Sequence, residues 1–294
     1  MNNLIYLVTD EDYIWWEKLN KNWKKIFNTN IGKPYSANKE DYINWELYQH
    51  STLDSLSRFT NENGITEKPN KIELALIINL EKLAYQKIRP DYKKNYPDFF
   101  MLDNIRSLLN LKKLKILSLG YNQIDNIEGF QNFQEIEEIA LHFNKIENLF
   151  SLQNLINLQN LDLHYNKIKD ITPLSKLKNL TKLDLRFNQI SDLTPLKYLT
   201  NLTELKLSNN QIKDITPISN LSNLTKLELN NNEIIDFSCL KNLKNLRILE
   251  LSNNQITDVS CVLEMKFLNY LFLSQNPIFN KILLIELHAT YINA

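Results

Sequence analysis

Two histidines and two aspartates have the residue types and the spacing needed to act together. His142 and His164 are 22 residues apart, and the same interval separates Asp162 from Asp184. Two imidazoles beside a carboxylate are groups used in acid–base catalysis and in zinc coordination. An imidazole also changes charge between about pH 5 and 8, which predicts a pH-dependent affinity if this group lies in a binding surface.

The rest of the sequence lacks the motifs of an enzyme. The four glycines do not have the spacing of a loop that cradles phosphate groups. The two cysteines and four histidines form neither CxxC nor HExxH. A strand surface also offers no closed pocket that excludes water. We therefore expect no enzymatic activity, no catalytic residues, no cofactor and no bound metal.

The interval of 22 residues recurs throughout the second part of the chain. The pattern LxxLxLxxNxI is clearest in residues 158–168, 180–190 and 202–212. Its asparagine stands at eight positions, each 22 residues after the last: Asn122, Asn144, Asn166, Asn188, Asn210, Asn232, Asn254 and Asn276. Eight coincident periods indicate an array of structural repeats.

This pattern resembles the leucine-rich repeat family, in the 22-residue form familiar from bacterial internalin-like proteins. The resemblance covers residues 111–280 as eight repeats without insertion. It implies an α/β fold: a right-handed solenoid in which a parallel sheet lines the concave side. It also suggests a bacterial source for the chain.

The repeat pattern has a direct physical interpretation. The alternation LxLx predicts a short strand with one buried face, and strands stack because one repeat cannot bury its leucines alone. The asparagine is expected to turn inward, where its amide can bond to backbone groups of the turn. Pro173, Pro195 and Pro217 predict that a short helical turn begins each return segment.

Cys239 and Cys261 stand at the proline position in later repeats. Because they are one repeat apart, they should lie on adjacent turns of the solenoid. In a reducing cytosol we expect two half-buried thiols, and a disulfide between them is the alternative.

Both ends of such an array need a cover for the leucine column. Residues 281–294 break the repeat and are expected to form a C-terminal capping helix. Residues 1–110 contain no repeat and are expected to form an all-helical N-terminal cap domain. Its predicted helices span residues 10–27, 39–59, 70–88 and 98–110.

Residues between the leucines of each strand are free to vary and should face outward on the concave side. The first four repeats place aromatic residues, histidines, aspartates and an arginine there. Since protein interfaces concentrate binding energy in Tyr, Trp and Arg, we expect this half to dominate partner binding. Alternatively, the aromatic residues only shield the turn and the charges are simply solvated. The predicted partner-binding residues are Tyr121, His142, Phe143, Asp162, His164, Tyr165, Asp184, Arg186, Phe187, Lys206, Glu228 and Glu250.

Charge and composition limit the kinds of partner. The chain has 34 basic and 34 acidic residues and a net charge of zero, which argues against binding to nucleic acid or to a membrane surface. With 43% hydrophobic and 23% charged residues it resembles an ordinary globular protein. The apolar run at residues 4–8 is too short for a secretory signal, so we expect a cytoplasmic location. We also expect a monomer when the chain is free.

These observations favour a non-enzymatic scaffold that captures a protein on its concave face. Such a scaffold could be an inhibitor or immunity-type protein, or an adaptor. The alternative is an enzyme or effector whose activity lies in the helical N-terminal domain, with the repeats selecting the target.

Overall fold

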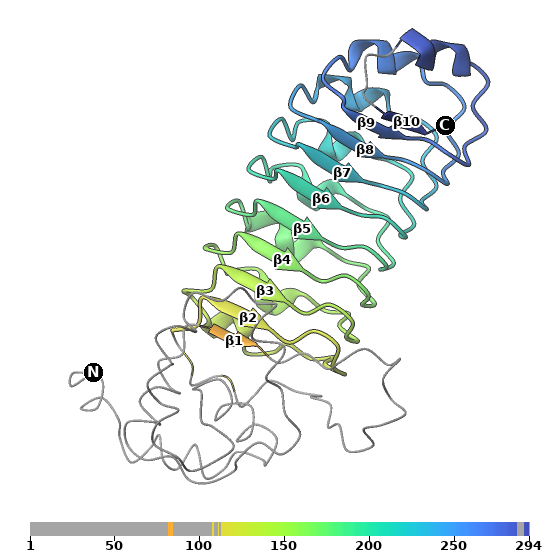
Figure 1. Ribbon diagram of the computed structural model, residues 1–294. Helices are drawn as coiled ribbons and strands as arrows, with labels where there is room; N and C mark the ends of the chain where they lie inside the picture. The colour runs from red at the N-terminus through yellow and green to blue at the C-terminus, as the bar shows by residue number, and fades with distance from the viewer. Residues whose placement is uncertain (1–81, 85–107, 109–110, 112, 287–290, 294) are drawn as a thin grey trace, which may run out of the picture.

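The computed structural model describes residues 82–84, 108, 111, 113–286 and 291–293, and all structural statements refer to them. Ten strands pair in sequence order into one parallel sheet (Figure 1). They are β1 Lys82–Ala84, β2 Ile116–Ser118, β3 Glu138–Ala140, β4 Asn160–Asp162, β5 Lys182–Asp184, β6 Glu204–Lys206, β7 Lys226–Glu228, β8 Ile248–Glu250, β9 Tyr270–Phe272 and β10 Tyr291–Asn293.

The eight strands from β2 to β9 recur every 22 residues and confirm the predicted repeats. Their register follows the repeat, since Leu117 lies opposite Ile139, which in turn lies opposite Leu161. The central residue of each of these strands is buried. The predicted repeat solenoid with a parallel sheet is therefore confirmed.

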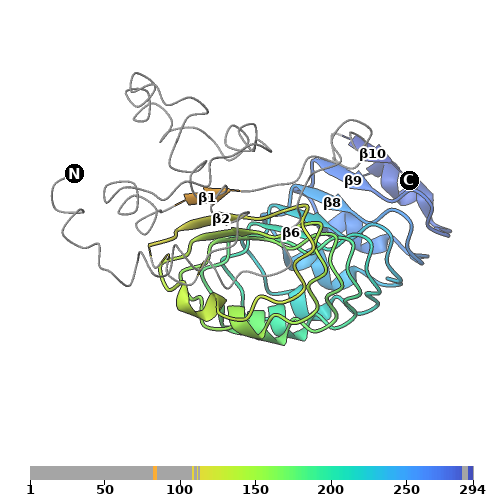
Figure 2. The ribbon, with the colours of Figure 1, turned by 90° about the horizontal axis from the view of Figure 1, so that it is seen from below.

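The return segments run along the opposite side of the solenoid from the sheet (Figure 2). They contain short 3₁₀ helices, of which η7, η8 and η9 begin with the predicted prolines. The helices are η5 Phe130–Asn132, η6 Phe150–Leu152, η7 Thr172–Lys176, η8 Thr194–Leu196, η9 Thr216–Ile218, η10 Ser238–Asn242, η11 Ser260–Glu264 and η12 Lys281–Glu286. None of the helices in the described part of the chain has the length and apolar character needed to cross a bilayer.

A side-chain hydrogen bond fixes the entry into most return helices. Oδ1 of Asp170 accepts from the backbone N–H of Thr172 at 2.8 Å, and Asn148 accepts from the N–H of Phe150 at the same distance. Either side chain can close this local turn, which explains why both residue types occur at the position. The turn sets the point at which the chain leaves the sheet side.

The core is one continuous column of apolar side chains from Leu108 to Leu284. Its largest fully buried members are Phe130, Phe133 and Phe237. Each turn of the solenoid is covered by the turns before and after it, so the array is stabilised by contacts between neighbours.

The eight repeat asparagines form a ladder of hydrogen bonds beside this core. Nδ2 of Asn188 donates to the carbonyl of Leu185 in its own turn at 3.0 Å and to the carbonyl of Leu163 in the preceding turn at 3.1 Å. Its Oδ1 accepts from the N–H of Ile168, also in the preceding turn, at 3.0 Å. The amides from Asn144 to Asn276 each tie two turns together in this way, while Asn122 donates to the carbonyls of Leu119 and Gly120 in its own turn. The inward orientation predicted for these residues is confirmed.

The residue before each repeat asparagine has a left-handed backbone conformation. The φ angle at these eight positions lies between 53° and 62°. They are Tyr121, Phe143, Tyr165, Phe187, Asn209, Asn231, Asn253 and Gln275. The conformation reverses the chain so that the following asparagine points inward. It disfavours bulky side chains and is best tolerated by Gly, Asn and Asp.

The helix predicted for residues 70–88 is wrong at residues 82–84, the part of it that the structure describes. Residues Lys82–Ala84 form strand β1, which pairs in parallel with β2 and extends the sheet beyond the first repeat. Leu80 and Leu83 have the spacing of the first two leucines of a repeat. The strand lies 34 residues before β2, however, so the 22-residue period does not reveal it. The helices predicted for residues 10–27 and 39–59, and most of 98–110, lie outside the described residues.

The capping helix predicted for residues 281–294 is also only partly correct. A 3₁₀ helix, η12, covers Lys281–Glu286, and the chain then forms strand β10 beside β9. The C-terminal end of the sheet is thus extended by a strand, which continues the backbone hydrogen bonding of the last repeat.

Replacing one ladder asparagine tests the role of the ladder in stability. In Asn188→Ala the buried N–H of Ile168 loses its acceptor, while the two leucine carbonyls keep a bond from a neighbouring asparagine. We expect a loss of about 2–4 kcal/mol in the free energy of unfolding, measured by urea denaturation. The control is Asn179→Ala, which removes one exposed bond to the carbonyl of Ile156 and should cost less than about 1 kcal/mol. Equal losses in the two variants would contradict this role.

The aspartates at the helix entries predict a component of stability that depends on pH. The hydroxyl and the backbone N–H of Thr172 lower the pKa of Asp170, and Thr194 does the same for Asp192. A pKa that is lower in the folded state stabilises the fold above about pH 4, and this contribution disappears as the pH falls through the lowered value. The double variant Asp170→Asn/Asp192→Asn keeps the turn bond but has no such component. The difference in urea midpoint between wild type and variant should therefore shrink from about pH 5 to about pH 3, and a constant difference would contradict the assignment.

Candidate functional site

The predicted site residues form three columns along the strand side of the solenoid, which we call the concave face. The first column is the last residue of each strand, for example Asp162 in β4. The second column, with His164, lies two residues later, and the third is the left-handed residue, here Tyr165. Only the first column therefore belongs to the strands. The expectation that all three are strand residues is corrected, because the second and third lie where the chain leaves the sheet.

The structure brings the two histidines and one aspartate into direct contact. The rings of His142 and His164 stack on adjacent turns, with centroids 4.8 Å apart and planes 7° from parallel. Nδ1 of His164 lies 2.6 Å from Oδ1 of Asp162, and Nδ1 of His142 lies 3.1 Å from Oδ2 of the same carboxylate. The second contact lacks hydrogen-bond alignment, and the buried Nδ1 of His142 has no hydrogen-bond partner among the described residues. We call these three residues the imidazole–carboxylate cluster.

The electrostatic environment keeps the carboxylate of the cluster ionised. Burial alone would raise the pKa of Asp162, but its contacts with His142 and His164 outweigh burial and lower the pKa well below its ordinary value. Asp162 is therefore an anion over the whole physiological pH range, placed between two imidazoles.

A glycine fixes the position of His142. A Cβ atom added at Gly120 would lie 2.5 Å from Nε2 of His142, so the imidazole packs directly over the glycine backbone. The ring of Tyr121 also meets His142 edge-on, with centroids 5.2 Å apart. A larger residue at position 120 would displace the imidazole. Gly120 is thus a positioning residue for the cluster.

Charged side chains extend the cluster across the next turns. Nη2 of Arg186 lies 2.6 Å from Oδ2 of Asp184, and Nη1 lies 3.5 Å from Oε2 of Glu228. Lys226 in turn lies 2.7 Å from Glu228. His164 connects this group to the cluster, since its Nδ1 is 3.9 Å from Asp184. Acids and bases alternate along this network, so most of its charge is neutralised within the face.

The first four left-handed residues form a continuous stack of aromatic rings along one edge of the concave face. The centroids of Tyr121 and Phe143 are 4.3 Å apart, those of Phe143 and Tyr165 are 4.1 Å apart, and those of Tyr165 and Phe187 are 3.9 Å apart. Neighbouring planes differ by at most 15°. Tyr165 is 38% exposed. We call these four residues the aromatic stack.

The remaining predicted site residues lie apart from the imidazole–carboxylate cluster. Lys206 pairs with Glu204 at 2.9 Å, and Glu250 accepts a hydrogen bond from the amide of Asn230 at 2.6 Å. In these later turns the third column carries Asn or Gln, and Nδ2 of Asn253 donates to Oδ1 of Asn231. The concave face therefore has an aromatic half and an amide half, as the sequence predicts.

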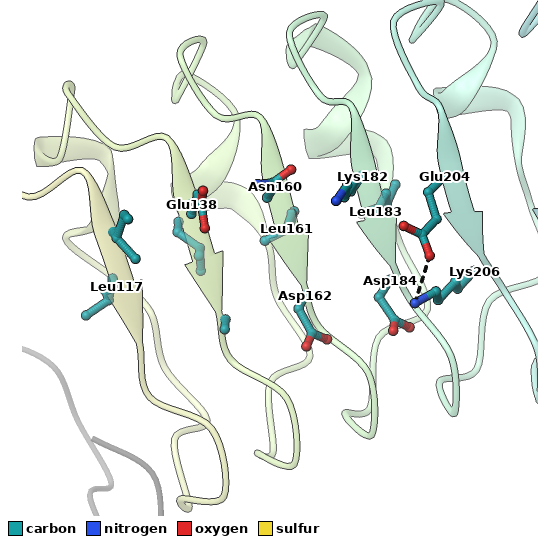
Figure 3. A pocket seen from close by; sticks show the side chains of 13 residues that line it. Leu117, Glu138, Asn160, Leu161, Asp162, Lys182, Leu183, Asp184, Glu204 and Lys206 are labelled. Carbon is teal, nitrogen blue, oxygen red and sulfur yellow. Dashed lines mark ion pairs between the residues drawn. The ribbon is translucent and has the colours of Figure 1, made fainter. Parts of the chain in front are cut away.

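The pattern LxxLxL contains a further outward column, which the predicted site does not include. The first residue of each strand also faces outward, and Glu138, Asn160 and Lys182 form a row beside Asp162 and Asp184 in Figure 3. Together with the small side chain of Ala140 they line a hollow of about 240 Å³. The outward position before the second leucine of each repeat is the signal that predicts this row.

The geometry gives little support for catalysis at the reactive groups. The hollow is open to solvent along the sheet, so it does not exclude water from a reacting group. Burial raises the pKa of Cys239 to about 11 and that of Cys261 to about 12, with a further contribution from the carboxylate of Asp236. Both cysteines are half-buried free thiols, as expected, and they stay protonated and poorly nucleophilic at neutral pH.

Comparisons with known proteins agree with the fold. The family described as leucine rich repeats (2 copies) matches residues 156–198 and 200–242, and a second leucine rich repeat family matches residues 242–262. No curated protein sequence matches the chain significantly.

Several solved structures are similar to the chain. Internalin C2 from Listeria monocytogenes is 33% identical over 74% of this chain and 88% of its own, with a TM-score of 0.61. An internalin of the same organism, InlF, is 28% identical over 66% of this chain and 71% of its own, with a TM-score of 0.52. The plant peptide hormone receptor RGFR1, solved with RGF2, is 27% identical over 67% of this chain and 35% of its own, with a TM-score of 0.54. The chain belongs to the leucine-rich repeat family, as a protein of the internalin-like type.

Proposed function

We propose that the chain is a non-enzymatic scaffold that captures a protein partner on the aromatic half of its concave face. Leucine-rich repeat proteins commonly bind protein partners, and internalin-like members are typically non-enzymatic. The similar receptor RGFR1 was solved in complex with RGF2, which is one such case. The observation that carries the proposal for this chain is the aromatic stack.

The aromatic stack occupies a backbone position that favours other residues. A left-handed conformation costs an ordinary residue about 1–2 kcal/mol, and Asn tolerates it well. Asn209, Asn231 and Asn253 form the same turn with nearly the same φ, so the fold does not require a ring there. Stacking of two rings stabilises the fold by about 0.5–1.5 kcal/mol per pair. This energy is similar to the strain of the left-handed conformation, so the rings bring no clear gain in stability. Four rings on successive turns are therefore better explained by recognition than by stability.

The stack and its neighbours define the chemistry of the partner. The rings lie face to face, so they present their edges and the tyrosine hydroxyls rather than their faces. Beside them, Asp184 and Glu228 hold the guanidinium of Arg186 in place. Since the charges of this network are already paired, they orient a partner more than they attract it over a distance. The partner surface should contain apolar or aromatic side chains together with hydrogen-bonding groups.

The charges in the row of first strand residues add a second element of recognition. Glu138 and Lys182 form no ion pair among the described residues, and both line the hollow of the concave face. A partner that places a basic group near Glu138 and an acidic group near Lys182 would match them. We infer that the hollow receives side chains of the same partner.

The effect that this chain has on the captured protein is a narrower proposal. A rigid face that covers part of another protein suits an inhibitor or immunity-type protein, and it equally suits an adaptor. The alternative in which residues 1–110 carry an activity falls almost entirely outside the described residues. The monomeric state and the cytoplasmic location also remain predictions from the sequence.

The proposed binding role of the aromatic stack can be tested by replacing its rings with Asn, the residue found at this position in later repeats. In the double variant Tyr165→Asn/Phe187→Asn we expect an unchanged or slightly higher free energy of unfolding, because Asn suits the left-handed conformation. Capture of the partner should fall at least about tenfold, since aromatic hot spots contribute 2 kcal/mol or more. The measurement is the amount of each protein retained from a lysate of the source organism by immobilised wild type and variant.

A matched control uses an exposed aromatic residue on the return side. Tyr198 is 63% exposed and follows η8, so Tyr198→Asn removes a similar ring from the other side of the solenoid. Proteins retained by wild type and by Tyr198→Asn, but not by the double variant, are partners of the concave face. If the double variant retains every protein that wild type retains, the aromatic stack is not the binding site.

A further inference from the structure

We propose that His142, Asp162 and His164 bind a divalent transition-metal ion of the Zn²⁺ class on the concave face. Among the described residues they form the one group of three potential metal ligands, with one donor atom of each within 4.8 Å of the others. The sequence predicts no metal ligands, and the inference departs from that expectation. It does not depend on the proposed function, because the site lies within a single chain.

The donor set determines which ions suit the site. Two imidazoles and one carboxylate match the nitrogen and oxygen ligands that Zn²⁺ and related ions prefer, whereas Mg²⁺ and Ca²⁺ prefer oxygen ligands alone. The carboxylate of Asp162 already lies beside both imidazoles, 2.6 Å from Nδ1 of His164 and 3.1 Å from Nδ1 of His142. Three protein ligands leave at least one coordination position for water or for a group of another molecule.

The buried ring nitrogen of His142 is a second, independent observation that supports a role as a metal ligand. Its Nδ1 is buried without a hydrogen bond, although a carboxylate oxygen lies 3.1 Å away. A buried polar atom that lacks a partner reduces stability, and such atoms are rare in proteins. A metal ion bound between this nitrogen and Asp162 would satisfy it. The ring itself is held in position by Gly120 and Tyr121.

Charged and aromatic side chains pack around the cluster. Asp184 lies 3.9 Å from Nδ1 of His164 and is itself held by Arg186. Phe143 meets the ring of His164 edge-on, with centroids 5.2 Å apart. These contacts restrict the side chains to conformations in which the donor atoms stay close together, so less entropy is lost when an ion binds. The side chains of His142, His164 and Asp162 are 12%, 18% and 33% exposed, so an ion can still reach them from solvent.

Binding requires a modest change in side-chain torsions. Zinc lies about 2.0–2.1 Å from each nitrogen, so the donors of a tetrahedral site are about 3.3 Å apart. The contacts of Asp162 with His142 and His164 are already 3.1 Å and 2.6 Å. The two parallel imidazoles must turn toward each other, because a metal lies near the plane of each ring that it binds. The backbone of the two turns can stay in place.

Zinc titration of the full-length chain tests the inference. Protein treated with a chelator and then freed of it is titrated with ZnCl₂ in a calorimeter, and MgCl₂ serves as the comparison ion. We expect one Zn²⁺ site that is lost or at least about 100-fold weaker in Asp162→Asn and in His142→Ala/His164→Ala, which exceeds the 10–100-fold effect of outer-shell partners. Saturating ZnCl₂ should also raise the thermal unfolding midpoint of wild type but not that of Asp162→Asn.

Two further variants separate ligation from general damage. Glu250→Gln neutralises a carboxylate in the same column as Asp162, four turns away, and should bind Zn²⁺ as wild type does. Gly120→Ala keeps all three ligands but pushes the ring of His142 aside, and should weaken binding by about tenfold. Circular dichroism of each variant confirms that the solenoid is folded.

Two results of the zinc titration would overturn the inference. Failure of wild type to bind Zn²⁺ overturns the inference, as does equal binding by wild type and the Asp162→Asn or double-histidine variant, which would place the ion elsewhere. The assay contains no partner protein, so its failure leaves the proposed capture of a protein untouched.

Discussion

The asparagine ladder is the interaction on which the shape of the molecule depends. From Asn144 to Asn276, each amide bonds to a carbonyl of its own turn and to an N–H and a carbonyl of the preceding turn. Neighbouring turns are therefore joined by side-chain hydrogen bonds that few other residue types could provide. These backbone groups are buried and cannot form hydrogen bonds with water. A side chain that both donates and accepts, such as an amide, is therefore nearly obligatory at this position. The left-handed conformation of the residue before each asparagine turns the chain so that the amide points inward. One side chain thereby fixes the spacing of the turns and the edge of the concave face.

Because the ladder fixes the backbone, the outward columns can change without changing the fold. The left-handed position shows this freedom most clearly, since it holds tyrosine and phenylalanine in four turns and Asn or Gln in the other four, at the same φ. Of the residue types found at this position, Asn causes the least strain. A ring is the choice that adds contact area to the surface, and stacking with the rings of adjacent turns compensates part of the strain. The division of the face into two halves therefore reflects different demands on its surface within one uniform backbone.

The sequence predicts this molecule well where the period holds and poorly where it fails. Spacing alone identifies the eight strands, the inward asparagines and the outward columns, because strand alternation and stacking leave little choice. The sequence does not predict strand β1, because β1 lies 34 residues before β2 and so breaks the period. It does not predict β10 either, because the segment KILLIELHATY has the pattern of a helix. The contact of Asp162 with both imidazoles could not be predicted either. Spacing places the three residues on adjacent turns, but side-chain torsions and the space above Gly120 decide that the two histidines converge on one carboxylate.

A repeat array places identical residue types next to each other without any change in the backbone. Any residue type that recurs after 22 positions stacks on its copy, so His142 meets His164 and Asp162 lies beside Asp184. Like groups at this distance repel when charged, and the concave face relieves the repulsion by placing acids and bases in alternation. The imidazole–carboxylate cluster and the aromatic stack share the same turns, and Tyr121 and Phe143 touch the histidines directly. An ion that turns the imidazoles must therefore alter the rings presented to a protein. The two binding events would then be coupled. If the ion changes the affinity for the partner by some factor, the partner changes the affinity for the ion by the same factor.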